Sequence, residues 1–479
     1  MVDTTVIRNA DWLVAWNEAT QSHVYKRGCD VAFAEGKITF VGRGYAGPAT
    51  KEIDGRDRFV LPGLVNIHTH PTSEPLRKGI TDETRSPNFW HSSLYEYLTI
   101  FHNDAAGYTA AIRCALAELL MSGVTTVVDI SMPFDGWLDE LADSGIRAVA
   151  APVYRDARWF TRNGHKLEYE WDKKAGREAF ERAQRVVELA RQHPSGRLSG
   201  MMSPVQIDTC SAELLRDSQD YAKERNLPLQ IHAAQSVTEF HEMVGRTGLT
   251  PIQWMDEIGI LSDNTIIGHG IFLDHHPWLH WTTRKDMGLL ADRGATVAHC
   301  PTVFVRRGIT LRTFGEYVRG GINMGIGTDT YPHNFLDEMR AVAYYARAVG
   351  ESVDDLQTLD VFNAATIGGA KALRRDDIGR LAVGTCADIL LCDTKEPAMR
   401  PLREPLRSLM YVAGDRAVRE VFVAGEMVVK DGKCLTIDLA AESEALEEAQ
   451  KRSMAGVAQR DWAGRTADEI APMVMPTVN

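Results

Sequence analysis

Apolar and polar positions follow two different patterns along this 479-residue chain. Near both ends, short apolar stretches alternate with polar residues and are interrupted by glycines, as in residues 30–42 and 419–429. A period of two with glycine at the turns is typical of β-hairpins. We therefore predict that the two ends fold together into one small β-sandwich, formed by residues 1–60 and 379–438.

The middle of the chain alternates short apolar runs with amphipathic segments, which indicates parallel β-α units. The apolar runs have the length of buried strands. They lie at residues 61–70, 125–130, 147–154, 198–207, 228–232, 265–269, 295–299 and 323–329. Segments between them, such as 178–192 and 212–225, carry apolar residues at helical spacing. The predicted fold class is α/β, with a (β/α)₈ TIM-like barrel over residues 61–378.

The last segment, residues 439–479, differs from both predicted domains. Between residues 440 and 460 it is rich in Ala, Glu and Gln, which predicts an exposed or subunit-contacting helix without chemistry of its own. We accordingly expect a homodimer or a higher homo-oligomer.

Composition narrows the choice of partners. The formal net charge of -12 is spread without acidic or basic runs, so neither nucleic acid nor an anionic membrane is an expected partner. The seven cysteines contain no Cys-x-x-Cys pair and predict neither a disulfide framework nor a thiolate zinc site. No apolar run approaches the roughly 18 residues of a membrane span, and the start lacks a signal-peptide pattern. We expect a cytoplasmic protein that acts on a small molecule.

Histidines mark the ends of several predicted strands. His68 and His70 are two residues apart at the end of the first barrel strand, so their imidazoles point to the same side. Later strands end in His232, His269, His299 and Asp329. Barrels of this kind keep their chemistry at the carboxyl ends of the strands, and imidazole and carboxylate groups suit a divalent first-row metal. Zinc is the first expectation, with Fe²⁺, Mn²⁺ or Co²⁺ as alternatives.

The motifs at these positions resemble those of the amidohydrolase superfamily. They are Pro-Gly-x-x-Asn-x-His-Thr-His, Ile-His-Ala-Ala, Gly-His, Ala-His-Cys-Pro and Gly-Thr-Asp. They are most similar to the mononuclear branch that holds triazine hydrolases, cytosine and guanine deaminases and adenosine-analogue deaminases. The resemblance implies that His68, His70, His232 and Asp329 bind the metal. It also implies that His269 contacts the hydroxide or the substrate oxygen.

The resemblance also implies the metal count and the chemical roles. Binuclear members carry a bridging lysine at the end of the fourth strand, and residues 201–208 contain none, so one metal ion per chain is expected. The metal would lower the pKa of its bound water to about 7. Asp329 would take the proton of that water, and His269 would donate to the oxygen on which negative charge develops.

Gln235 departs from the deaminase pattern. Deaminases of this branch usually have a glutamate three residues after the fifth-strand histidine, where it carries a proton to the ring nitrogen of an aromatic base. A glutamine cannot shuttle protons, so Gln235 favours hydrolysis of an open-chain acyl bond. That reaction needs only polarisation of the oxygen and protonation of the leaving group. The alternative that another acid replaces the glutamate stays open.

Aromatic and apolar residues in the predicted loops favour an apolar substrate pocket. The candidate substrate contacts are Trp90, Tyr95, Trp159, His299 and Phe304. Together with residues 73–79, Gln235 gives a narrower resemblance to phenylurea hydrolases and the molinate (thiocarbamate) hydrolase. The first hypothesis is therefore hydrolysis of a C–N or C–S acyl bond in a small apolar urea, carbamate or thiocarbamate.

Two other functions compete with this hypothesis. One is deamination or dechlorination of an aromatic N-heterocycle such as a triazine, purine or pyrimidine. The other is a catalytically silent barrel that acts as a scaffold, which is disfavoured because none of the expected metal-site residues is missing.

Overall fold

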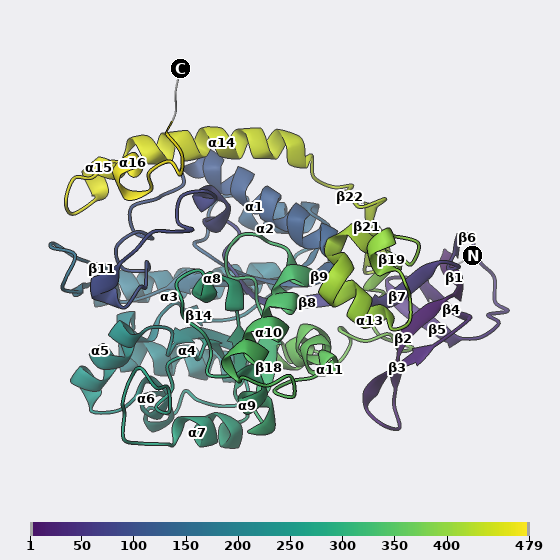
Figure 1. Cartoon of the computed structure of the whole chain (residues 1–479), viewed down its shortest axis with the longest axis horizontal. Coiled ribbons are helices and arrows are strands. Elements are labelled where there is room, and N and C mark those ends of the chain that lie inside the picture. Colours follow the sequence, from purple (N-terminus) through teal and green to yellow (C-terminus); the bar gives the residue numbers. More distant parts are fainter. Residues whose placement is uncertain (1–2, 477–479) are drawn as a thin grey trace.

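The computed structural model describes residues 3–476 and contains the expected barrel together with a separate β domain built from both chain ends (Figure 1). The barrel sheet has the strand order β13-β10-β9-β8-β18-β17-β16-β15. Its strands are β8 (Leu64–Thr69), β9 (Val124–Ser131), β10 (Arg147–Tyr154), β13 (Leu198–Gly200), β15 (Leu229–Ala233), β16 (Thr265–His269), β17 (Thr296–His299) and β18 (Asn323–Ile326). Strand β14 (Ser203–Pro204) pairs with β10. Bridges from Met202 to Leu229 and from Gln206 to His232 close the ring.

Helices follow the strands and cover the outside of the barrel (Figure 1). They are α1 (Ala105–Met121), α2 (Trp137–Asp143), α3 (Lys173–Arg191), α4 (Ala212–Glu224), α5 (Val237–Thr247), α6 (Pro251–Glu257), α7 (Asp286–Arg293), α8 (Pro301–Val305), α9 (Phe314–Arg319), α10 (Phe335–Val349), α11 (Thr358–Asn363) and α12 (Gly369–Ala372). A further short helix, α13 (Pro405–Ser408), comes after the barrel in the chain. Helix α3 shows why these segments are helical. Asp172 caps its first turn by accepting the N–H of Ala175, and Phe180, Ala183 and Val187 form its buried face.

Apolar side chains from neighbouring strands form one buried cluster in the barrel. The strand residues in it are Val65, Ile67, Val128, Ile130, Val149, Ala151, Met201, Ile266 and Ala298. The pairing of β8 with β9 slips between Asn66 and Thr69. Such an irregularity re-aims the side chains that follow it. His68 and His70 then come together at the carboxyl end of β8, with ring centroids 5.2 Å apart.

The β domain consists of two sheets with the orders β5-β4-β1-β6 and β22-β21-β20-β19-β7-β2-β3. The strands are β1 (Thr4–Ala10), β2 (Trp12–Asn17), β3 (Ser22–Lys26), β4 (Cys29–Ala34), β5 (Lys37–Gly42), β6 (Lys51–Asp54), β7 (Arg58–Pro62), β19 (Ile389–Asp393), β20 (Val418–Val423), β21 (Glu426–Lys430) and β22 (Lys433–Cys434). Antiparallel pairing of β7 with β19 joins the two chain ends. Ile7 and Val31 of the first sheet share a core with Leu13 and Ile389 of the second.

A buried ion pair connects this β domain to the barrel. Arg147 of β10 donates from Nε and Nη2 to Asp388, at 3.0 Å each, and the two side chains are 5% and 2% exposed. The carboxylate also accepts the backbone N–H of Ala424 at 2.7 Å, and the carbonyl of Asp388 accepts the N–H of Gly63. Asp388 is therefore a junction between the barrel and strands from both chain ends.

The tail forms the expected helix, and the chain itself covers one face of that helix. Helix α14 (Leu439–Ala455) lies along α1 (Figure 1), and Leu446 and Ala449 pack against Ala110 and Cys114. Two short helices, α15 (Val457–Arg460) and α16 (Ala467–Ile470), follow it. They contribute to a cluster with side chains from the long segment after β8. Within the described part of the chain, no helix is both long and apolar enough to cross a bilayer.

Candidate metal centre

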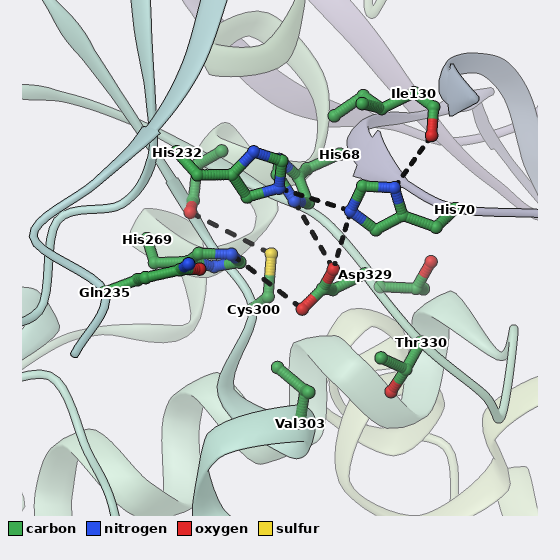
Figure 2. Close-up of polar contacts among 12 residues, drawn as sticks. His68, His70, Ile130, His232, Gln235, His269, Cys300, Val303, Asp329 and Thr330 are labelled. Carbon is green, nitrogen blue, oxygen red and sulfur yellow. Dashed lines mark hydrogen bonds and ion pairs between the residues drawn. The ribbon is translucent and has the colours of Figure 1, made fainter. Parts of the chain in front are cut away.

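Four side chains from three strand ends converge at the carboxyl end of the barrel (Figure 2). His70 Nε2 lies 3.2 Å from His232 Nε2 and 3.2 Å from Asp329 Oδ1. His68 Nε2 lies 3.4 Å from the same carboxylate oxygen. Donor atoms that share a tetrahedral ion at bonds of about 2.1 Å are about 3.4 Å apart. The donor set therefore fits one divalent metal ion.

Hydrogen bonds outside the cluster set the orientation of two of the imidazoles. His70 Nδ1 donates to the carbonyl of Ile130 at 2.7 Å, and His232 Nδ1 donates to the carbonyl of Val205. Each ring thereby turns an unprotonated Nε2 toward the cluster. Both ring nitrogens of His68 are buried and have no hydrogen-bond partner among the described residues. Burying polar atoms in this way is costly unless a ligand compensates them, so His68 also fits a metal.

The charge states of the cluster suit metal binding. Burial, reinforced by the neighbouring histidines, lowers the pKa of His232 well below its ordinary value. Burial alone would raise the pKa of Asp329, but the facing imidazoles of His269, His68 and His70 bring it well below its ordinary value. These shifts favour neutral His232 and ionised Asp329, which are the forms that bind metal.

His269 lies beside the cluster rather than within it. Its Nε2 is 3.9 Å from Asp329 Oδ2, and its ring packs on Phe304 with centroids 4.6 Å apart. Both His269 and Asp329 have positive φ, at 84° and 57°, a conformation that is uncommon for residues with side chains and concentrates at functional sites. At Gly327, an added Cβ would lie 2.4 Å from His68 Cβ. Glycine is thus required there for His68 to keep its place.

A cavity of about 290 Å³ opens beside this cluster. Its wall includes His70, His232, His269 and Asp329, so a bound molecule would reach the donor atoms directly. Of the five substrate contacts expected from the sequence, Trp159 and Phe304 also line the cavity.

The other three expected contacts lie elsewhere among the described residues. Trp90 is 48% exposed on the surface. Tyr95 is fully buried and shares a hydrogen bond of 2.7 Å with Ser236. His299 is buried, and its ring faces Phe314 with centroids 5.7 Å apart. An aromatic residue in an active-site loop thus packs against the protein as readily as it faces substrate.

Charged residues of the cavity were not predicted from the sequence. They are Glu74, Arg77, Arg155, Arg306 and Arg307. Two signals were visible: Arg155 directly follows the third barrel strand, and the double arginine follows the His-Cys-Pro motif of the seventh. The expectation of an apolar pocket considered only the aromatic side chains. The wall of the cavity contains both apolar and charged side chains.

Gln235 belongs to a chain of buried hydrogen bonds. Its Nε2 donates to Gln206 Oε1 at 2.9 Å, and Gln206 Nε2 donates to Glu239 Oε2 at 3.0 Å. Glu239 also accepts the backbone N–H groups of Ala234 at 2.6 Å and Gln235 at 3.2 Å. No described residue donates to Gln235 Oε1, and Gln235 lines the cavity. Gln235 can therefore accept a hydrogen bond from a bound molecule.

The model of the amidohydrolase family matches residues 59–428. The chain belongs to the amidohydrolase family. This amidohydrolase is 28% identical to a 5'-deoxyadenosine deaminase of Methanosphaera stadtmanae over 84% of its length and 89% of that relative. It is also 28% identical to a 5-methylthioadenosine/S-adenosylhomocysteine deaminase of Natronomonas pharaonis, over 85% and 89% of the two chains.

Solved structures share the fold of this amidohydrolase. A zinc-bound adenosine deaminase from Xanthomonas campestris is 24% identical, with a TM-score of 0.80, covering 95% of this chain and 99% of that one. A zinc-complexed atrazine chlorohydrolase from Arthrobacter aurescens TC1 is 20% identical, with a TM-score of 0.78, covering 93% and 100%.

The expected hydrolysis of a urea, carbamate or thiocarbamate is wrong. The curated relatives named above are deaminases, and each matches this chain over most of its length. This agrees with the second enzymatic hypothesis, which included deamination of an aromatic N-heterocycle. The expectation depended on Gln235, because a glutamine carries no proton. A carboxyl group missing at one position does not exclude one elsewhere, and Glu74 lines the same cavity.

Proposed function

We propose that this amidohydrolase is a metal-dependent aminohydrolase that removes an amino group from an aromatic N-heterocycle, with adenosine-type nucleosides as the first substrate class to test. The observation that carries the proposal is the convergence of three imidazoles and Asp329 on one cavity, with His269 beside them. The names of the curated relatives support the reaction type.

His68, His70, His232 and Asp329 would hold one divalent ion, with zinc as the first expectation. Bound there, the ion would supply a water that ionises near neutral pH. Asp329 would accept a proton from the attacking water, and His269 would stabilise the oxygen that adds to the ring. Gln235 would accept a hydrogen bond from the amino group or a ring N–H of the substrate.

Glu74 is assigned the delivery of a proton to the ring nitrogen. Besides Asp329, it is the one carboxyl group among the described residues that lines the cavity. Its backbone N–H donates to the carbonyl of His70 at 3.1 Å, which fixes it next to a metal ligand, and its side chain is 6% exposed. Its carboxylate forms an ion pair with Arg77, which holds the side chain in the cavity wall.

The reaction itself is tested by ammonia release. The metal-loaded protein should release ammonia from at least one aminated purine, pyrimidine, triazine or nucleoside, and mass spectrometry should show the amino group replaced by oxygen. Ureas and carbamates serve as the comparison. If none of the aminated rings yields ammonia, the proposal is overturned.

Glu74→Gln should lower kcat on that substrate by about 10²-fold, because the side chain keeps its shape and loses its proton-carrying oxygen. Metal content should be unchanged. Glu83→Gln, an exposed neighbour on the same segment, is the control and should keep the parental rate. Full activity of Glu74→Gln would remove Glu74 from the mechanism.

The purified protein should contain one equivalent of metal, because one donor set fits one ion. Cys300 and His269 also approach His68, but burial raises the pKa of the Cys300 thiol well above its ordinary value, which disfavours the thiolate that would bind metal. Cys300→Ser should therefore retain the metal, whereas His70→Ala should lose most of it. Elemental analysis that finds two equivalents, with activity following the second, would contradict the assignment.

A further inference from the structure

The cavity wall contains an excess of positive charge. Four arginines line it, namely Arg77, Arg155, Arg306 and Arg307, whereas its carboxyl groups are Glu74 and Asp329. Two of the arginines have carboxylate partners: Arg77 pairs with Glu74, and Arg306 lies 3.5 Å from Asp82. The other two have none among the described residues.

Arg155 has no hydrogen-bond or ion-pair partner within residues 3–476. It directly follows β10 and is half-buried, and burial lowers the pKa of its guanidinium. The nearby carboxylate of Asp208 accepts hydrogen bonds at Oδ2 from Trp159 Nε1 at 3.0 Å and from the Tyr169 hydroxyl at 2.7 Å. Its Oδ1 has no hydrogen-bond partner among the described residues and forms no ion pair with Arg155. A guanidinium remains charged in proteins and offers five donors. Arg155 lines the cavity, so its guanidinium is available to a molecule bound there.

Arg307 is partly buried, like Arg155, and is bound by uncharged oxygens only. Its nitrogens donate to Ser93 Oγ at 2.8 Å and to the carbonyls of Val303 at 2.6 Å and Thr81 at 3.4 Å. These hydrogen bonds hold the side chain in place but do not neutralise its charge. A buried charge without a counterion is costly, and an anion in the cavity would offset that cost.

We propose that the substrate carries an anionic group as well as the aminated ring, and that Arg155 binds this group while Arg307 adds to the positive potential. This inference rests on the proposed function. The anion is a carboxylate or a phosphate, the two groups that a guanidinium binds in bidentate geometry. A zwitterionic amino-acid substituent on the substrate fits less well. Its ammonium group would need a carboxylate partner, and Glu74 is already paired with Arg77.

The test compares rings that differ only in one substituent. Adenosine, adenosine 5'-carboxylate, adenosine 5'-monophosphate and the zwitterionic S-adenosylhomocysteine would be assayed with the holoenzyme. We expect kcat/KM for one anionic form to exceed that of adenosine by about 10- to 100-fold, the range for a hydrogen bond to a charged group. Comparing adenosine 5'-carboxylate with adenosine 5'-monophosphate shows which of the two anions the site binds. Equal values for the neutral and both anionic forms, or a preference for the zwitterion, would overturn the proposal.

Arg155→Gln should remove this preference mainly by raising KM for the anionic form, with kcat nearly unchanged. Arg155→Lys keeps the charge and should retain part of the preference. The control is Arg158→Gln, since Arg158 lies on the same segment with its side chain 64% exposed and pairs with Glu170. If Arg155→Gln keeps the preference of the parent, Arg155 is not the anion ligand and the proposal fails.

Binding measurements separate this inference from the proposed function. Calorimetry with the deaminated compounds inosine and inosine 5'-monophosphate, and with inosine 5'-carboxylate, requires no turnover. Tighter binding of an anionic form than of inosine, lost in Arg155→Gln, would support the anion site even if no ring releases ammonia. Equal binding of the neutral and anionic forms would overturn it even if adenosine is deaminated.

Discussion

Asp329→Asn should lower the rate of ammonia release by a factor of about 10² to 10⁴, the range for loss of a general base. The carboxylate has two tasks in the proposed site: Oδ1 lies within 3.4 Å of His68 and His70, and Oδ2 faces His269 at 3.9 Å. An amide keeps the shape of the side chain, but it cannot take a proton at neutral pH and is a weaker metal ligand.

Two measurements separate these tasks. Metal content reports the loss of a ligand, and kcat at saturating metal reports the loss of the base. Asp337→Asn is a matched control, because its carboxylate lies on α10, shortly after Asp329, with its side chain 45% exposed. It should keep both the metal and the rate. Unchanged metal content and kcat in Asp329→Asn would contradict the proposed role.

The fold and the location of the site were predictable from the sequence for a physical reason. Parallel strands that are buried on both faces appear in the sequence as runs of apolar residues. A barrel places the carboxyl ends of these strands at one face. Histidines at the ends of β8, β15 and β16 were therefore expected to meet at that face, although His299 at the end of β17 turns toward Phe314 instead. His68, His70, His232 and His269 follow this rule.

The cavity wall could not be predicted in the same way. Its side chains come from long connections, where the direction of each side chain depends on tertiary contacts and not on a period. Tyr95 and Trp159 illustrate this: their rings touch, with centroids 5.2 Å apart, yet only Trp159 lines the cavity. Nor could the sequence show that Arg155 would lack a partner, because partners are set by the fold.

The substrate class was missed because a chemical role was read from a single position. Gln235 occupies the place of the expected proton carrier, and the backbone and side-chain contacts of Glu239 fix the surrounding loop. The cavity brings Glu74, from a distant part of the chain, into the same wall. Spatial convergence of this kind cannot be read from one motif.

Asp388→Ala should reduce the free energy of unfolding by about 3 to 5 kcal/mol, the usual cost of breaking a buried ion pair by removing one partner. The substitution leaves the guanidinium of Arg147 buried without a counterion, and it also frees the N–H of Ala424. Because the pair joins the barrel to the β domain, the substitution should weaken the interface between these two parts. Urea unfolding followed by circular dichroism would measure it.

The comparison with an exposed pair tests whether burial is the cause. Arg56 and Asp54 form an ion pair at 2.6 Å with side chains 73% and 57% exposed, so Asp54→Ala should change the free energy of unfolding by no more than about 1 kcal/mol. The double variant Arg147→Met/Asp388→Leu should recover much of the lost stability, because it removes both buried charges and fills their space with apolar atoms. If Asp388→Ala unfolds at the same urea concentration as Asp54→Ala, the junction contributes no more than a surface pair. The stability of the interface would then depend on the apolar contacts around it.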